Sequence, residues 1–450
     1  MDLKGKRILV IGMGKTGLST IRFLVGQGAR VFATDVKPVD EWLETVRAYE
    51  TADAKIEICS YDTNILSRTD MIIPSPGVPP ADPILSEAVR RGIPVYSEIE
   101  LASRFLETPM IAITGTNGKT TTTTLVGEIL MGTGKKAFVG GNIGNPLIEY
   151  IDGSQDSDYA VVEVSSFQLQ WIERFHPTVA VLMNVTSDHI DYHGDIEVYR
   201  GIKERIFMNQ TDSDLAVLNA DEPPTEILMK NLSAQVCCFS VFCKRNQGIF
   251  LDGDFLVYQR NNNIPEKYPL SMIKMPGVHN IHNVMAAVAV SRACGCSAED
   301  ITRCVENFHG IAHRIEYAGE KKGVSFYDDS KGTNVGAVLC AVNTFTNPVI
   351  LLMGGRDKDV DFSVLIPLLR EKVKELILFG EARDKIFSAI GDVVKTCPIG
   401  TLKEAVAMAY DHAAAGDVVL LSPGCASFDE FRDYKERGRF FKAVVESLEG

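Results

Sequence analysis

Several features that define other classes of protein are missing from this 450-residue sequence. No apolar stretch reaches the roughly 18 residues that span a membrane, and the N-terminus lacks the pattern of a signal peptide. There is no long run of basic residues and the formal net charge is −13, which argues against nucleic acid as a partner. The ten cysteines contain no C-x-x-C pair and fit no zinc spacing, so we expect reduced thiols and a cytoplasmic location.

What the sequence does contain is typical of a globular enzyme. Apolar residues make up 45% of the chain and charged residues make up 23%. A single hydrophobic core does not extend over 450 residues, so the length indicates about three domains.

The most informative motif lies at residues 110–121. The run 110–113 has the apolar, partly β-branched composition of a buried parallel strand, and GTNGKTT leads from it into a segment with helical spacing. Strand, glycine loop, lysine and helix N-terminus together predict a phosphate-binding loop, with a threonine hydroxyl available for Mg²⁺. The spacing is shorter than the usual G-x-x-x-x-G-K-[ST], because position 113 is Ile rather than Gly.

A second glycine motif stands near the N-terminus. Residues 6–35 follow a strand–turn–helix–strand pattern with G-x-G-x-x-G over residues 12–17, and Asp35 lies where a ribose-binding acid would be expected. The pattern admits a nicotinamide or flavin site, a turn that binds the phosphates of another substrate, or a tight turn without a ligand. No hydride-transfer site is evident further along the chain, so we favour the second interpretation.

Polar residues follow two later strands of the predicted central sheet. The strand YAVVE ends in Glu163, and the strand VAVLM runs into a loop that carries Asn184, Asp188, His189, Asp191 and His193. The carboxyl ends of parallel strands share one edge with the phosphate loop, which is where an α/β fold places Mg²⁺ ligands. Spacing does not fix which residues bind the ion, and we prefer Asp188 and His189 to Asp191 and His193.

Two helices carry further candidates. In the predicted helix 195–209, Lys203 shares a face with aromatic residues such as Tyr199, and such a lysine usually extends its amine to solvent. A later helix presents Asn280 and Asn283 in its first turn, where they would either contact a nucleotide or cap the helix.

The last third of the chain contains more strands that end in polar or glycine-rich loops. Four such strands are expected after residue 310, with helices such as 401–415 between them, and they predict a second doubly wound α/β unit. Before this unit, we expect residues 228–275 to form an irregular insert of short strands.

Ten motifs, taken in order, resemble those of the Mur ligases of bacterial peptidoglycan synthesis. They are GTNGKTT, GGNIG, EVSSFQLQ, NVTSDHID, YRGIKERIF, GVHNIHN, HRIE, DDSKGTN, GGRDKDVDF and LSPGCASFDEFRDYKERG. The resemblance extends over the whole chain, and SSFQL and SPGCASFDEF are most similar to the family member that adds D-glutamate.

The resemblance implies an α/β protein of three domains. Residues 1–98 would form a Rossmann-like domain that binds a UDP-linked substrate, and residues 99–310 a central P-loop ATPase-type domain. Residues 311–450 would form a C-terminal Rossmann-like domain that binds the amino acid.

The resemblance also implies roles for individual residues. Those matched to ATP binding are Gly115, Thr116, Asn117, Gly118, Lys119, Thr120, Thr121, Asn280, Asn283, Arg314 and Asp329. Those matched to the UDP-linked substrate are Lys15, Thr16, Asp35, Ser75, Pro76, Gly77 and Asn142. Those matched to D-glutamate are Lys331, Thr333, Lys358, Ser427 and Phe428. Two Mg²⁺ sites would use Thr121, Glu163, His189 and Lys203, the last as a carbamate, and the catalytic residues would be Lys119, Glu163, His189 and Lys203.

The implied reaction joins UDP-N-acetylmuramoyl-L-alanine to D-glutamate through an acyl phosphate made from ATP. We expect a monomer that acts only on small molecules. Three rivals are a sister Mur ligase or folylpolyglutamate synthase, a nicotinamide dehydrogenase, and a nucleotide-binding module without catalysis.

Overall fold

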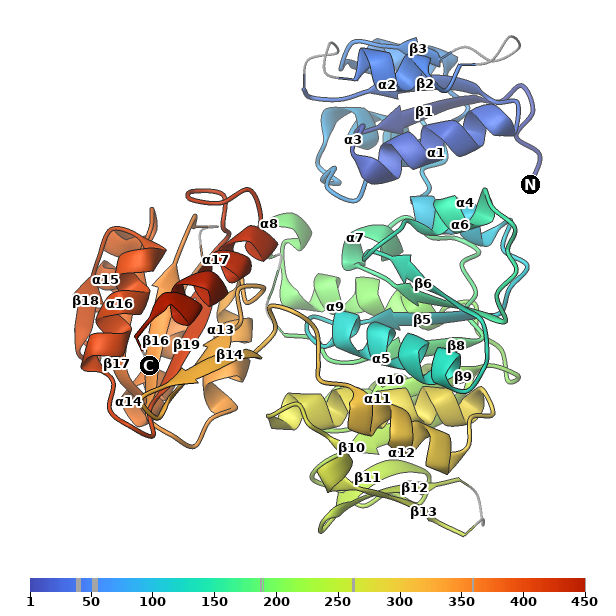
Figure 1. The fold of residues 1–450 in the computed structure, drawn as a ribbon. Helices are drawn as coiled ribbons and strands as arrows, with labels where there is room; N and C mark the ends of the chain where they lie inside the picture. The colour runs from blue at the N-terminus through green and yellow to red at the C-terminus, as the bar shows by residue number, and fades with distance from the viewer. Residues whose placement is uncertain are drawn as a thin grey trace. The chain divides into compact units, whose positions relative to one another are not determined.

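A computed structural model describes residues 1–37, 42–50, 56–186, 188, 190–260, 264–357 and 360–449, without the side chains of residues 190 and 191. The chain divides into two compact units (Figure 1). Unit 1 comprises Met1–Leu270 and His282–Val305, and unit 2 comprises Ser271–Ile281 and Glu306–Gly450.

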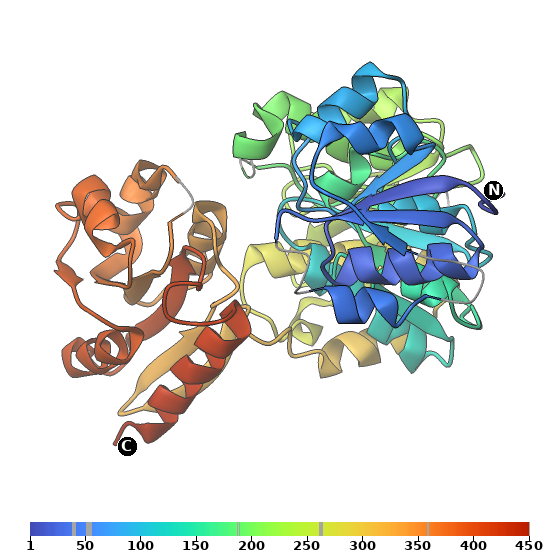
Figure 2. The ribbon, with the colours of Figure 1, turned by 90° about the horizontal axis from the view of Figure 1, so that it is seen from above.

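The N-terminal part of unit 1 is a four-stranded parallel sheet of order β3-β2-β1-β4 (Figure 2, blue strands). Alternate residues of one strand pack on opposite faces: Ile8 and Val10 join the cluster under α1, and Leu9 and Ile11 join the cluster under α3. Its elements are β1 (Arg7–Ile11), α1 (Lys15–Gly26), β2 (Arg30–Thr34), α2 (Leu43–Arg47), β3 (Ile56–Ile58), β4 (Met71–Pro74) and α3 (Pro83–Arg90). The predicted Rossmann-like arrangement is confirmed.

The rest of unit 1 is built on a nine-stranded sheet of order β13-β12-β11-β10-β9-β8-β5-β7-β6. Its strands are β5 (Met110–Thr114), β6 (Ala137–Gly141), β7 (Tyr159–Glu163), β8 (Val179–Leu182), β9 (Leu215–Asn219), β10 (Gln235–Ser240), β11 (Gly248–Asp252), β12 (Phe255–Gln259) and β13 (Glu266–Pro269). Its helices are α4 (Glu98–Ser103), α5 (Lys119–Gly132), α6 (Leu147–Ile151), α7 (Ser166–Leu169), α8 (Ile190–His193), α9 (Ile196–Glu204), α10 (Thr225–Asn231), α11 (Val278–Ala293) and α12 (Ala298–Asn307). The division between the units assigns the first turn of α11, residues 278–281, and the last two residues of α12 to unit 2.

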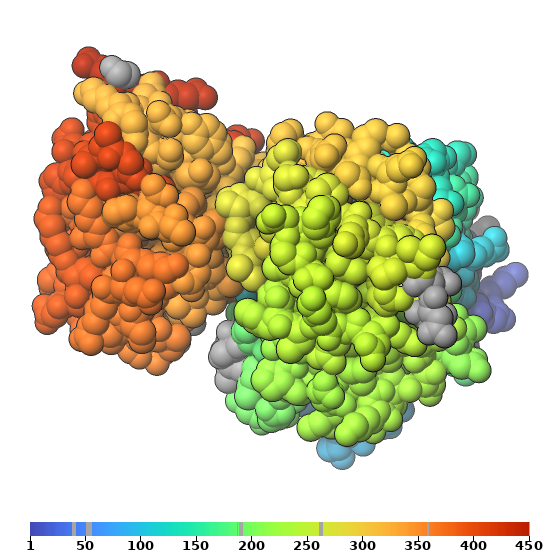
Figure 3. Space-filling view, turned by 90° about the horizontal axis from the view of Figure 1, so that it is seen from below, coloured from blue at the N-terminus to red at the C-terminus, as the bar shows by residue number. Residues whose placement is uncertain are grey.

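The segment expected as an irregular insert instead extends the central sheet. β10 pairs with β9 in parallel, β11 continues in parallel, and β12 and β13 add antiparallel strands. The yellow-green surface in Figure 3 belongs to this extension. The predicted short strands are present, but the segment is not an irregular insert; short strands alone do not reveal which neighbour they pair with.

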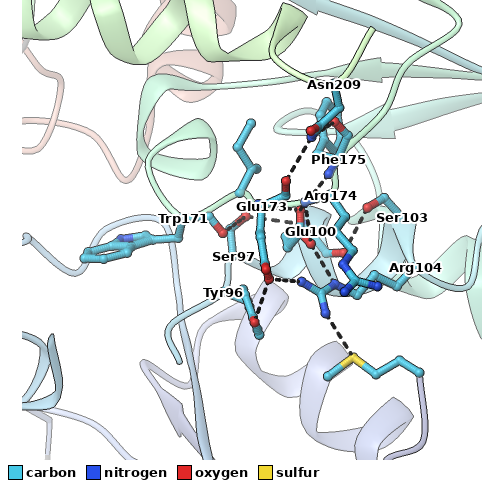
Figure 4. Close-up of polar contacts among 12 residues, drawn as sticks. Tyr96, Ser97, Glu100, Ser103, Arg104, Trp171, Glu173, Arg174, Phe175 and Asn209 are labelled. Atoms are coloured by element: carbon cyan, nitrogen blue, oxygen red, sulfur yellow. Dashed lines mark hydrogen bonds and ion pairs between the residues drawn. The ribbon is translucent and has the colours of Figure 1, made fainter. Parts of the chain in front are cut away.

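A buried carboxylate joins α4 to the segment after α7 (Figure 4). Glu100 is fully buried and accepts the backbone N–H groups of Glu173, Arg174 and Phe175. The Arg104 guanidinium donates to Glu100 at 2.7 Å and to the Glu173 carboxylate at 2.7 Å. These bonds fix α4, which follows the N-terminal sheet, against the central sheet.

Unit 2 is a six-stranded sheet of order β14-β15-β19-β16-β17-β18. Its strands are β14 (Glu316–Lys321), β15 (Val324–Asp328), β16 (Val349–Gly354), β17 (Val373–Phe379), β18 (Thr396–Pro398) and β19 (Val418–Gly424), and its helices are α13 (Val335–Asn343), α14 (Ile366–Lys372), α15 (Arg383–Ile390), α16 (Leu402–His412) and α17 (Tyr434–Ser447). The four expected strands are present as β14, β15, β16 and β19, whereas β17 and β18 were not predicted. β14 pairs with β15 in antiparallel orientation, so one edge departs from a purely parallel doubly wound sheet.

None of the helices in the described part of the chain combines the length and apolar character that a membrane crossing requires.

Candidate active site

The predicted phosphate loop connects β5 to α5. Gly118 has φ +84° at the position before the helix, a conformation that glycine adopts without strain. The Lys119 amine turns back over the loop and donates to the carbonyl oxygens of Gly115 and Thr116, both at 2.8 Å. The first N–H groups of α5 have no acceptor within the helix, so the loop offers an anion both a cation and backbone donors.

A second lysine reaches the same carbonyl. Lys203, on α9, donates to the Gly115 oxygen at 2.9 Å, and its side chain is only 1% exposed. Burial, and after it the neighbouring Lys119 ammonium, lower the pKa of Lys203 well below its ordinary value. The prediction that the Lys203 amine extends to solvent is therefore wrong, because α9 packs this face inward.

The predicted carboxylate lies beside these lysines. Glu163 ends β7, is 2% exposed, and accepts the side-chain amide of Asn142 on Oε1 at 2.8 Å. Its Oε2 atom is buried without a hydrogen-bond partner among the described residues. An uncompensated carboxylate oxygen is costly to bury, so this atom fits a cation ligand, and a set of carboxylate and hydroxyl oxygens suits Mg²⁺.

The structure describes only some of the remaining predicted metal ligands. Thr121 is buried in the first turn of α5, and Asp188 lies close enough to raise the pKa of Lys203 in opposition to its burial. His189 lies outside the described residues, so its role stays a prediction. The alternative candidate His193 packs inward, with its Nε2 atom 2.9 Å from the Ser166 hydroxyl oxygen.

The N-terminal glycine turn is held by two of its predicted site residues. Asp35 accepts the Met13 N–H at 2.6 Å, and the Ser75 hydroxyl donates to the Gly12 carbonyl at 2.8 Å. A side chain at Gly17 would put its Cβ 1.9 Å from the Gly12 oxygen, which explains the third glycine of the motif. Asp35 is thus already engaged by the backbone of the turn, which weakens its interpretation as a ribose ligand of a dinucleotide.

Other residues matched to the UDP-linked substrate lie around this turn. The Lys15 amine donates to the Gly144 carbonyl and to Asn145 Oδ1, both at 2.8 Å, and so connects α1 to the loop after β6. Thr16 is half-buried on α1, and Pro76 and Gly77 continue the loop that Ser75 begins.

The two asparagines of α11 have different environments. The Asn283 side-chain oxygen lies against the phosphate loop, where it would be 2.3 Å from a Cβ at Gly118. Asn280 donates to the Pro276 carbonyl at 2.7 Å, a contact with the chain entering its own helix. Asn283 therefore lies at the phosphate loop, whereas in its contact Asn280 donates to a carbonyl oxygen rather than accepting a free N–H of the first turn, which is not a capping contact.

In unit 2, predicted residues occupy loops at the carboxyl ends of β15 and β19. Asp329 is buried and accepts the Ser422 hydroxyl at 2.7 Å; burial raises the pKa of Asp329 to about 7, against the opposing effect of Arg314. The Lys331 amine lies 4.1 Å from the centre of the Tyr434 ring.

The other residues matched to D-glutamate differ in how far they are exposed. Thr333 is half-buried in the same loop as Lys331, and Ser427 is buried after β19. Phe428 is 60% exposed, and Lys358 lies outside the described residues.

The structure adds a residue that the motifs alone did not single out. Arg437 on α17 is fully buried and donates to Ser330 Oγ and to the carbonyl oxygens of Ser330, Cys425 and Ala426 at 2.8–3.2 Å. Burial lowers the pKa of Arg437 to about 10. An arginine on a helix is most often exposed, so no sequence signal marked it apart from its place in the last motif.

Three family models match successive parts of the chain. The N-terminal domain of MurD-like Mur ligases matches residues 6–97, the Mur ligase middle domain matches 113–291, and the Mur ligase glutamate ligase domain matches 313–425.

Curated relatives are similar over their full length. The UDP-N-acetylmuramoylalanine--D-glutamate ligase of Syntrophus aciditrophicus is 56% identical over 449 residues, covering 100% of this chain and 99% of the relative. The protein of the same name from Geotalea daltonii is 45% identical over 451 residues, with the same coverage.

Solved structures share the fold. A pseudomurein peptide ligase type C from Methanothermus fervidus has a TM-score of 0.61 and 17% identity, covering 99% of this chain and 100% of that one. The MurF ligase of Thermotoga maritima in complex with ADP has a TM-score of 0.60 and 16% identity, covering 99% and 96%. The three matched domains and the full-length identity agree with the loop geometry, and the chain belongs to the Mur ligase family.

Proposed function

We propose that this chain is an ATP-dependent ligase that forms an amide bond between UDP-N-acetylmuramoyl-L-alanine and D-glutamate in peptidoglycan precursor synthesis. The observation that carries the proposal is the meeting of Lys119 and Lys203 at the Gly115 carbonyl, on the sheet edge that also carries the buried Glu163. Full-length similarity to relatives of that name supports the choice of substrates.

The first step activates a poor acyl donor. A carboxylate oxygen of the UDP-linked substrate attacks the γ-phosphorus of ATP, the bond to the β-phosphate oxygen breaks, and an acyl phosphate and ADP result. Lys119 and the N–H groups at the start of α5 would stabilise the charge on the transferring group. Two Mg²⁺ ions, held by Thr121, Glu163, His189 and carbamylated Lys203, would supply further charge neutralisation.

The second step forms the amide. The amine of D-glutamate attacks the acyl carbon, a tetrahedral intermediate forms, and inorganic phosphate leaves with the bonding electrons. The incoming ammonium must first lose a proton, for which His189 or bulk water is the acceptor. Lys331 and Lys358 would pair with the carboxylates of D-glutamate, and Thr333, Ser427 and Phe428 would complete its site.

The other assignments follow the family match. Residues proposed for the UDP-linked substrate are Lys15, Thr16, Asp35, Ser75, Pro76, Gly77 and Asn142. Residues proposed for the nucleotide outside the phosphate loop are Asn280, Asn283, Arg314 and Asp329. We also propose that the protein acts as a cytoplasmic monomer on small molecules only.

The test is phosphate release by the purified chain with ATP, Mg²⁺ and UDP-N-acetylmuramoyl-L-alanine. Release should depend on D-glutamate and should not be supported by L-glutamate, L-alanine or a diamino acid. Release with another amino acid alone would indicate a sister ligase, and binding of NADH without any ligase activity would favour the dehydrogenase reading of residues 12–17.

A further inference from the structure

The phosphate loop is paired with the segment after β8. β5 and β8 pair in parallel up to Thr114 and Leu182, and the backbone bonding continues past both strands. The Met183 N–H donates to the Thr114 carbonyl at 3.0 Å, and the Thr116 N–H donates to the Asn184 carbonyl at 2.9 Å. The loop that carries the proposed ATP site is therefore attached to the segment that leads to Asp188 and His189.

At the next residue, Asn117, the hydrogen bonds to the loop come from a side chain instead of the backbone. Asn117 N–H donates to Asn184 Oδ1 at 2.9 Å, and Asn184 Nδ2 donates to the Asn117 carbonyl at 3.1 Å. Both polar groups of one residue's main chain are thus bound by one carboxamide. Only this orientation of the carboxamide works, because the reverse would bring two donors together and two acceptors together.

The loop that Asn184 contacts is shorter than the usual phosphate-binding motif. The longer G-x-x-x-x-G-K-[ST] loop has two more residues before its lysine, whereas here Asn117 stands directly before Gly118 and α5. The carboxamide of asparagine offers a donor and an acceptor in one plane, and a glutamine would be one methylene too long for the observed contact. Aspartate, serine and alanine would each leave part of the Asn117 main chain unpaired.

We propose that Asn184 is a positioning residue for the nucleotide. By fixing the Asn117 main chain it sets the direction in which Gly118 and the first N–H groups of α5 face the phosphates. The inference rests on the proposed binding of ATP at this loop. It assigns to Asn184 neither contact with ATP nor a part in the chemistry.

The experiment compares Asn184→Asp and Asn184→Ala with a matched control. Asn209→Asp removes an equivalent side-chain donor elsewhere in unit 1, where Asn209 Nδ2 donates to the carbonyls of Glu173 and Phe175 at 2.9 and 3.0 Å (Figure 4). Calorimetry measures ADP and ATP affinity with Mg²⁺, steady-state kinetics measures KM for each substrate, and thermal unfolding measures stability.

Both Asn184 variants should lose about tenfold or more in nucleotide affinity, since at least one hydrogen bond is lost and a main-chain group is left unpaired. The KM for D-glutamate should stay within about twofold, and Asn209→Asp should leave nucleotide affinity unchanged. Asn184→Asp should bind more weakly than Asn184→Ala at pH 8, because its carboxylate faces the Asn117 carbonyl.

Failure of this inference can be told from failure of the proposed function. If the unsubstituted chain binds no ATP, the nucleotide site itself is misplaced. If it binds ATP and both Asn184 variants bind equally well, Asn184 does not position the loop. Equal losses in Asn184→Asp and Asn209→Asp, with equal loss of thermal stability, would assign Asn184 a role in stability only and overturn the proposal.

Discussion

In unit 1 the phosphate loop is held by several side chains, with the Lys119 and Lys203 amines among them, whereas in unit 2 the loops after β15 and β19 share one buried guanidinium. The Asn184 carboxamide pairs with the Asn117 main chain, and the Thr116 hydroxyl accepts the Thr186 N–H at 3.0 Å. In unit 2 the guanidinium of Arg437 donates four hydrogen bonds to Ser330, Cys425 and Ala426.

The two arrangements differ in how much depends on a single side chain. In unit 1 several hydrogen bonds hold the phosphate loop, and each stabilises the fold by roughly 1 kcal/mol. In unit 2 a full charge has been removed from water, and its desolvation is offset only if every donor keeps its acceptor. One substitution should therefore disturb unit 2 more than unit 1.

The largest expected effect is on catalysis in unit 1. Lys119→Ala removes the cation that the proposed mechanism places on the transferring phosphoryl group, so ATP-dependent phosphate release should fall on the order of 10³-fold. The loop keeps its hydrogen bonds to Asn184, Thr186 and Lys203, so thermal unfolding should change little. Lys136→Ala, at an exposed lysine whose side chain is 69% accessible, should retain full turnover. Undiminished release by Lys119→Ala would overturn the assignment of the ATP site.

Much of the fold was accessible from the sequence because strand composition and glycine loops are local signals. β5 with its loop, β15, β16 and β19 all lie where their patterns predicted them. β17 was missed, and its sequence VKELILF has Lys374 and Glu375 near the start of its apolar run. The pairing of β10–β13 with the central sheet depends on contacts distant in the chain.

The candidate site was less accessible for a similar reason. Lys203 has an ordinary amphipathic context, and only packing shows that its amine is buried beside Lys119. The roles of Asn184 and Arg437 depend on which main-chain groups their side chains reach, and spacing does not reveal that. Glu163, in contrast, was predicted at a strand end and lies buried there.

The next effect concerns stability and tests the buried charge of unit 2. Arg437→Met should destabilise the protein by about 3–5 kcal/mol, because three carbonyl groups and a hydroxyl lose their donor in a buried site. Chemical denaturation, followed by a probe in unit 2, measures this. Arg439→Met, at an exposed arginine of the same helix, is the control and should change the free energy of unfolding by less than about 0.5 kcal/mol.

Unit 2 should also show a functional consequence. Where Arg437→Met remains folded, its KM for D-glutamate should rise, since Ser330 and Ala426 lie next to the residues matched to that substrate. An unfolding free energy equal to that of the control would mean that the buried guanidinium contributes nothing net, and the contrast between the units would disappear.

The smallest expected effect concerns Glu98, a buried carboxyl group of unit 1 that contacts α6 and not the phosphate loop. Glu98 on α4 is 1% exposed and accepts the Ile148 N–H at 2.7 Å, while its Oε2 atom is buried without a partner among the described residues. Burial raises the pKa of Glu98 from 4.5 to about 7. The stability linked to this proton is fully present below pH 4.5 and is lost as the pH rises through about 7, because the unfolded chain releases the proton earlier.

Glu98→Gln removes this titration, so the variant should gain up to about 3 kcal/mol relative to the unsubstituted chain between pH 4.5 and pH 8. Urea denaturation across that range measures the gain, and Glu107→Gln, at an exposed glutamate, should show none. Nucleotide affinity should not change, because Glu98 contacts α6 rather than the phosphate loop. A parallel loss of ATP affinity would mean that unit 1, like unit 2, makes its site depend on one buried charge.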